Sequence, residues 1–351
     1  RIFQWMVALD GALLLFVSYM VTDYEIIPVY WLAAVYGLTL FTYNLHYPNL
    51  YAFVQELFEP RYYSMVNSAI EIQGQVTNAL GMLTAGVLLV GSADGMPGWW
   101  PTAWQFEAWS MAEIFRLDGS TYLMSFVLIS LIRYIPDPGK RIDKGAVLAR
   151  IQQGFQYLWS RKPLLVFGVS SHMIFFSLLV LMHFLLAVYV KDYLQANADT
   201  MAHFKGMYAV GAVLSGLIML RLAVVERHVI KVIVSLLLMT ASMYVICIFL
   251  PWVWGLLAVA VILGLCNAGA RILRITYIIR VVPTRVVGRV NAFFSVVNVA
   301  FRSAFLSLMT IPFFSGPDSG HHVLYAFGIL AVLLYGSAGL LYHWRGAIEK
   351  S

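Results

Sequence analysis

Charged side chains and cysteines are both scarce in this 351-residue chain. Only 11% of the residues are Asp, Glu, Lys or Arg, and just two are cysteines, Cys247 and Cys266. Both cysteines lie in apolar stretches, so the sequence offers neither a disulfide framework nor zinc-ligand spacing. A phosphate-binding loop and a Ser-His-Asp order are also missing from the sequence. We therefore expect a protein that is not an enzyme and that needs no metal and no cofactor.

Apolar residues are abundant instead, and they gather in long runs. They make up 61% of the chain, and the mean hydropathy is +0.79. Ten hydrophobic stretches follow one another, at residues 2–21, 29–45, 63–90, 120–134, 164–190, 207–225, 229–250, 252–270, 290–312 and 323–342. Most of them approach the roughly 20 apolar residues that an α-helix needs to cross a bilayer. The sequence therefore predicts an all-α, polytopic membrane protein.

Basic residues concentrate in alternate gaps between these stretches. Seven of them lie at 133–162 and five at 271–289, and the C-terminal segment adds Arg345 and Lys350. Loops rich in Lys and Arg stay on the cytoplasmic side of a membrane. We therefore expect the C-terminus in the cytoplasm. The net charge of +6 then reflects topology signals and contacts with anionic lipids rather than nucleic-acid binding.

A short internal repeat relates the two halves of the chain. Residues 58–68 align with residues 282–292 at one constant offset, which pairs Arg61 with Arg285. Each copy lies where a loop leads into a long apolar stretch. Parallel repeats of this kind occur in transporters built from two related halves. We expect a four-helix, incomplete N-terminal bundle at 1–135, lacking two helices before residue 1, and a six-helix bundle at 163–351.

Residues 136–162 connect the two predicted bundles. Val147, Ile151, Phe155 and Leu158 recur there at helical spacing, and polar residues occupy the other faces. A helix with this pattern lies in the plane of the membrane surface. We therefore expect a cytoplasmic linker that carries an amphipathic helix.

Three segments together resemble the major facilitator superfamily, in the branch that includes enterobactin-type and macrolide-type bacterial exporters. They are 59–68, 154–163 and 282–290, and they stand in the order of that family's loops. The resemblance implies two pseudo-symmetric bundles, with about ten of twelve helices present, in a bacterial inner membrane. It also implies a proton-coupled secondary transporter that exports a small amphipathic molecule by alternating access. Its partners would be that substrate, protons and membrane lipids.

Two departures from the family pattern keep a second function open. The proline of the fifth-helix motif is missing from residues 81–86, and Trp99, Trp100, Trp104 and Trp109 crowd one outer loop. The alternative is a subunit or scaffold of a larger membrane complex, with a membrane-protein partner and no transport activity. A polar central chamber would favour the transporter, whereas an apolar one would favour the scaffold.

Polar side chains at membrane depth define the candidate site, because a charge is costly there. Glu71 lies in the middle of its stretch, and Gln75 and Asn78 follow on the same helical face. They predict a cavity lining in which Glu71 accepts a proton or contacts substrate, or else a buried packing contact. Arg302 lies at a corresponding depth in the second half. A pair of Glu71 with Arg302 could open on protonation or form a static salt bridge.

Further polar residues have other candidate roles. His172 could relay protons near neutral pH or serve as a packing residue. Position and resemblance together assign an inner gate or structural charge network to Asp10, Arg61, Asn267, Arg271, Arg285 and Arg289.

Overall fold

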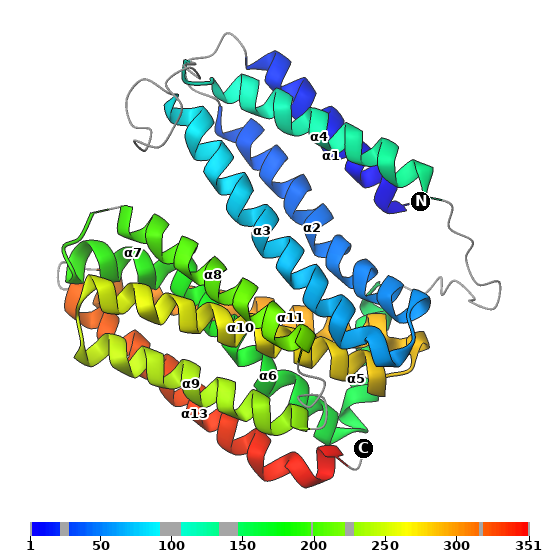
Figure 1. Ribbon diagram of the computed structural model, residues 1–351, viewed down its shortest axis with the longest axis vertical. Helices are drawn as coiled ribbons and strands as arrows, with labels where there is room; N and C mark the ends of the chain where they lie inside the picture. Colours follow the sequence, from blue (N-terminus) through cyan, green and yellow to red (C-terminus); the bar gives the residue numbers. More distant parts are fainter. Residues whose placement is uncertain are drawn as a thin grey trace. The chain divides into compact units, whose positions relative to one another are not determined.

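The computed structural model describes residues 2–21, 28–91, 107–132, 147–197, 199–221, 228–315 and 319–349, and these are nearly all helical (Figure 1). The long helices are α1 (Ile2–Met20), α2 (Val29–Leu57), α3 (Tyr63–Val90), α4 (Met111–Leu131), α6 (Lys162–Val180), α8 (Asp199–Arg221), α9 (Val229–Phe249), α10 (Val253–Val281), α11 (Thr284–Met309) and α13 (Ser319–Glu349). The short elements are η1 (Pro60–Tyr62), α5 (Val147–Trp159), η2 (Leu181–Leu185), α7 (Leu186–Val188), η3 (Tyr189–Tyr193) and α12 (Pro312–Ser315). The predicted all-α class is confirmed.

Eight of the described helices are long and apolar enough to cross a membrane. One of these spans runs through α6, η2, α7 and η3 as a continuous segment of 32 residues. Helix α2 contributes a shorter apolar segment, Val29–Tyr43. Helix α3 has 28 residues and carries the polar residues Asn67, Glu71 and Gln75 in its N-terminal half. These results confirm a multi-pass membrane protein.

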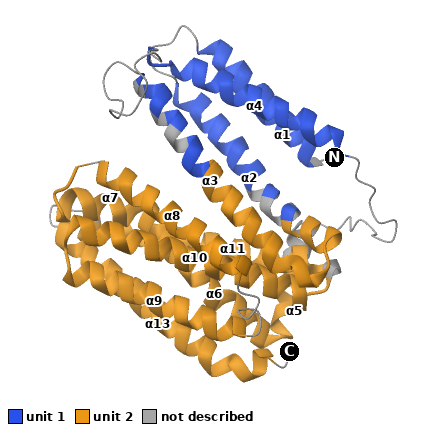
Figure 2. Ribbon diagram, viewed as in Figure 1, with its two compact units in different colours: residues 1–50, 78–144 blue, residues 51–77, 145–351 orange. Residues whose placement is uncertain are grey.

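The chain divides into two compact units, residues 1–50 with 78–144 and residues 51–77 with 145–351 (Figure 2). Helices α2 and α3 are each shared between the units. Helix α5 lies inside the predicted linker. The boundaries that the sequence suggested for the membrane bundles stay a prediction.

The first unit, residues 1–50 and 78–144, is organised by the pairing of α1 with α4. The two helices approach so closely that a Cβ atom on Gly11 would lie 3.0 Å from the carbonyl oxygen of Gly119. Beside this crossing, apolar side chains form a small core of Leu14, Val17, Val21, Ala112 and Phe115. Ser110 begins α4 with a capping box, in which its side chain accepts from the backbone N–H of Glu113.

The second unit, residues 51–77 and 145–351, is built around α10. Helix α8 lies directly against α10, and a Cβ atom on Gly211 or Gly264 would clash with the backbone of the facing helix. Small residues let membrane helices pack this closely. A large core surrounds the fully buried rings of Phe167, Tyr189 and Tyr244. This rigid packing fixes the polar side chains of α10 that form the site described next.

Candidate functional site

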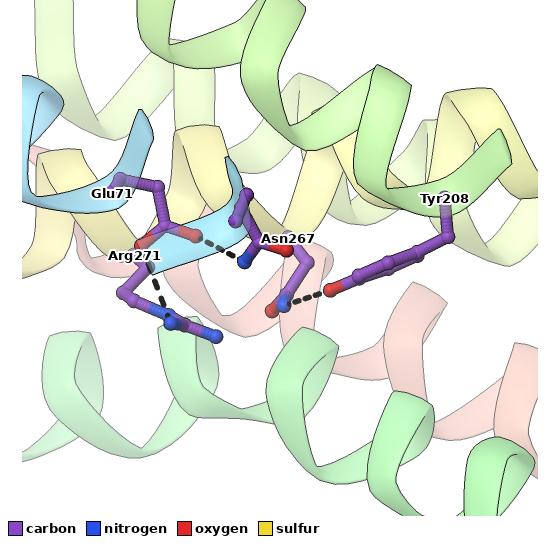
Figure 3. Close-up of polar contacts among 5 residues, drawn as sticks. Glu71, Tyr208, Asn267 and Arg271 are labelled. Carbon is purple, nitrogen blue, oxygen red and sulfur yellow. Dashed lines mark hydrogen bonds and ion pairs between the residues drawn. The ribbon is translucent and has the colours of Figure 1, made fainter. Parts of the chain in front are cut away.

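The centre of the site is Glu71, whose side chain is only 5% exposed on α3. One carboxylate oxygen, Oε1, accepts a hydrogen bond from Nε2 of Gln75 at 2.9 Å. The other, Oε2, accepts from Nη1 of Arg271 on α10 at 3.2 Å, which forms an ion pair (Figure 3). The Arg271 guanidinium also lies over the ring of Phe175, 5.3 Å from its centroid. Both oxygens of the buried carboxylate are therefore bonded.

A second polar contact lies one turn along α10 from this ion pair. Asn267 is buried, and its Nδ2 donates to the hydroxyl oxygen of Tyr208 on α8 at 2.6 Å. Figure 3 shows Asn267 between Arg271 and the ring of Tyr208. The Tyr208 hydroxyl is also close enough to interact electrostatically with Arg271 and Glu71. Three helices, α3, α8 and α10, thus contribute to one connected group of polar side chains.

Further polar contacts attach the segment 51–77 to α10. Nδ2 of Asn67 donates to Oγ1 of Thr276 at 3.1 Å, and both side chains are buried. Nε2 of Gln55 donates to the carbonyl oxygens of Ile279 at 2.9 Å and Val282 at 3.2 Å. These last two acceptors lie at the C-terminal end of α10, where carbonyl groups lack partners within the helix. A line of hydrogen bonds therefore follows α10 from Asn267 to its end.

The structure brings together part of the polar face that the sequence predicted. Gln75 bonds Glu71, as two residues one turn apart on a helix can, but Asn78 is exposed and belongs to the first unit. The cationic partner of Glu71 is Arg271, not Arg302, which is half-buried on α11. The repeat matched residues by their depth in the membrane, and depth does not determine which helix faces Glu71.

His172 lies on α6 in tightly packed surroundings. Its Nδ1 is 2.7 Å from the carbonyl oxygen of Gly168, and its ring stacks on Phe294 of α11 with centroids 5.1 Å apart. A proton-relay role for His172 stays a prediction.

The other predicted gate residues are dispersed. Arg61 is exposed and pairs with Glu59 at 2.9 Å. Asp10 is buried within the first unit. Arg289 is half-buried on α11, and Arg285 lies in the first turn of the same helix, where its side chain is outside the described part of the structure.

Sequence reasoning missed three contributors to this site, Tyr208, Gln55 and Thr276. A tyrosine in an apolar helix gives no distinctive signal, because aromatic residues are common in membrane helices. Gln55 and Thr276 could have been noticed as polar residues in long helices, but their acceptors and donors are more than 200 residues away in the sequence.

The chemistry of the site is that of charge pairing and hydrogen bonding. Within the described ranges, no group of three or more His, Cys, Asp or Glu side chains could hold a metal ion. A buried carboxylate beside one arginine can take up a proton, and its attraction for the arginine is lost when it does. The neighbouring amides and the Tyr208 hydroxyl can donate to a bound molecule or to one another.

Comparison with known proteins identifies the family. The model of the Major Facilitator Superfamily matches residues 4–306. The chain belongs to the major facilitator superfamily. This superfamily consists of transporters, so a carrier of small molecules, rather than an enzyme, is the activity that membership supports.

Solved structures of the superfamily share the fold. A bacterial homologue of the iron transporter ferroportin, in an outward-facing state, is 13% identical with a TM-score of 0.61, covering 98% of this chain and 84% of that one. The E. coli fucose:proton symporter is 13% identical with a TM-score of 0.63, covering 95% of this chain and 82% of that one. No curated protein matches the sequence. At such low identity, these likenesses establish the fold alone.

Proposed function

We propose that the protein is a proton-coupled exporter of a small amphipathic molecule in a bacterial inner membrane, with its C-terminus in the cytoplasm. The exporter assignment is supported by the resemblance of residues 59–68, 154–163 and 282–290 to the loops of bacterial exporters. Proton coupling is the named property of one structural relative, the fucose:proton symporter. In this chain we assign the coupling to the ion pair of Glu71 and Arg271.

The assignment of proton coupling to this ion pair is supported most by which segments the pair connects. It joins the segment 51–77, from the first half of the sequence, to α10 in the second half, at a separation of 3.2 Å. Alternating access requires contacts between the halves that form in one state and break in another. Arg271 begins the basic cytoplasmic gap of the sequence, so the pair would hold the cytoplasmic side closed. A proton on Glu71 would remove its charge and release Arg271.

The buried hydrogen bonds around the pair support a transporter over a scaffold. A scaffold can fill the space between its helices with apolar side chains, which avoids the cost of polar groups at membrane depth. This chain instead keeps Glu71, Asn67 and Asn267 buried in the same region of unit two. A transporter that exchanges protons and rearranges must keep such polar side chains despite their cost.

The proposal can be tested in proteoliposomes with an imposed pH gradient, using the amphipathic cation ethidium as the probe. Wild-type protein should move ethidium against its gradient. Glu71→Gln should lose this gradient-driven movement and keep ethidium exchange at equal pH, because Gln preserves size and hydrogen bonding but cannot be charged. Glu59→Gln is the matched control, since Glu59 forms an exposed ion pair with Arg61. If Glu71→Gln moves ethidium as well as wild type under the gradient, Glu71 is not the coupling residue.

A further inference from the structure

A second arginine of α10, Arg274, takes no part in the coupling proposal. It lies inside the apolar span Val253–Val281, and only 5% of its surface is exposed. It forms no ion pair with any residue that the structure describes. A charged side chain inside a membrane span is costly and is a candidate functional group for that reason. Arg274 is therefore a buried positive charge that lacks a counter-charge in the described part of the chain.

The hydrogen bonding of Arg274 uses only one edge of its guanidinium. Nη1 donates to the carbonyl oxygen of Ser171 on α6 at 2.9 Å, and Ser171 is fully buried. Nε and Nη2 have no acceptor among the described residues. Their N–H groups point in parallel from the opposite edge of the guanidinium, which is the fork that can hold both oxygens of a carboxylate.

The charged side chains beside Ser171 and α10 leave one positive charge in excess. Arg271 lies three residues before Arg274, about one helical turn away, and Glu71 balances its charge at 3.2 Å. Arg274 adds a second guanidinium without a second acid. His172 of α6 supplies no negative charge, since its Nδ1 lies 2.7 Å from a backbone carbonyl oxygen. A bound anion with a single charge would complete the balance.

The form of the unused fork narrows the chemistry of that anion. A carboxylate carries one charge and two oxygens in a plane, which matches one excess charge and two parallel N–H donors. A halide matches the charge but cannot accept two parallel hydrogen bonds at separate atoms. A phosphate group carries about −1.5 to −2 charges at neutral pH, which exceeds what Arg274 alone can balance. The carboxylate is the ligand that fits both features.

We propose that Arg274 binds the carboxylate of the natural substrate through its Nε and Nη2 atoms. This inference rests on the proposed export of an amphipathic molecule, and it assigns that molecule a carboxylate head group. Arg271 stays paired with Glu71 while the carboxylate is bound, so recognition and coupling use two neighbouring arginines of one helix. Ethidium shares the apolar, aromatic character of such a substrate but has no carboxylate. It therefore probes coupling without engaging this fork.

The test measures binding to the purified full chain in detergent at neutral pH, without a gradient. The melting temperature is followed against the concentration of naphthylacetate, of its uncharged amide, and of acetate. Wild type should show a saturable rise with naphthylacetate, and the amide should bind at least about tenfold more weakly, because it cannot make charge-assisted hydrogen bonds. Acetate has the head group without the apolar part and should stabilise only at far higher concentrations.

Variants of α10 assign the effect to Arg274. Arg274→Gln should lose the preference for the acid over the amide. Arg274→Lys keeps the charge without the fork and should keep only part of that preference. Arg280→Gln, at an exposed position on the same helix, is the matched control and should bind as wild type does. The comparison of acid with amide in wild type decides the question even if the Arg274 variants cannot be purified.

Three results would overturn the carboxylate site. They are equal binding of the acid and the amide to wild type, an unchanged preference in Arg274→Gln, and stabilisation by acetate at the same concentrations as naphthylacetate, which would indicate a free anion instead of a substrate. The export proposal fails separately. Wild type that prefers naphthylacetate to its amide but does not move ethidium under a pH gradient would refute export alone. Wild type that moves ethidium but does not distinguish acid from amide would refute the carboxylate site alone.

Discussion

The ion pair of Glu71 and Arg271 should show a strong energetic coupling in the folded protein. At a separation of 3.2 Å, two unit charges attract by about 5 kcal/mol at an effective dielectric constant near 20. Desolvation of the two charges offsets much of this attraction, so the net contribution of the intact pair to the free energy of unfolding is small. Removing one partner from a buried pair is different, because the remaining charge is left uncompensated at a cost of about 3–5 kcal/mol.

The two single substitutions should not cost the same. The Glu71 side chain is 5% exposed, whereas that of Arg271 is 19% exposed and has the Phe175 ring as a second partner. We expect Arg271→Gln to destabilise the fold by about 3 kcal/mol, because it leaves the more buried charge alone. Glu71→Gln should cost about 1 kcal/mol, and the double variant about the same, so that the coupling energy is about 3 kcal/mol.

Reversible unfolding of the wild type, the two single variants and the double variant in mixed micelles measures this coupling energy. The exposed pair of Glu59 and Arg61 provides a control cycle, for which we expect about 0–1 kcal/mol. A coupling energy between Glu71 and Arg271 no larger than that of the control pair would refute the reasoning, since it would mean that the ion pair is solvated.

Three further substitutions have clear expected outcomes in the same unfolding assay. Gly211→Ala should destabilise the fold by roughly 1–3 kcal/mol, because its Cβ would clash with a carbonyl group of α10. Gly206→Ala on the same helix is the control and should be neutral or stabilising, because its Cβ meets nothing within 4 Å. Equal effects of the two substitutions would show that α8 and α10 are not closely packed. Tyr208→Phe removes the acceptor of Asn267 and should cost about 1–3 kcal/mol, so an unchanged stability would mean that this hydrogen bond is absent. Ser110→Ala should cost about 1 kcal/mol by removing the helix cap of α4, and restored stability in Ser110→Asp would confirm the capping origin.

Helix positions follow closely from the sequence wherever apolar residues dominate. Long hydrophobic runs must become helices in a membrane, because every backbone hydrogen bond has to be made inside the segment. The fourth helix shows where this reasoning falls short. The apolar run suggested a start near residue 120, but α4 begins at Met111, because Ser110 and Glu113 form a capping box ahead of the hydrophobic part. That signal was present in the sequence as Ser-x-x-Glu.

The site was only partly predictable, for a physical reason. Spacing along one helix places Gln75 beside Glu71, because residues four apart share a face. Contacts between helices depend on rotation and crossing angle, which composition does not determine. The sequence therefore identified both Glu71 and Arg271 as important and assigned them to different groups, and Tyr208 gave no signal at all.

The central claim is that protonation of Glu71 separates the segment 51–77 from the second half of the chain. The most direct measurement is a pulsed electron–electron distance between spin labels at Met65 of α3 and Leu238 of α9, both exposed, with Cys247 and Cys266 replaced by Ala. If protonation of Glu71 opens this contact, the wild-type distance distribution gains a longer population as the pH falls, and Glu71→Gln shows that longer population at every pH. A wild-type distribution that does not change with pH, together with an identical one in Glu71→Gln, would contradict the claim.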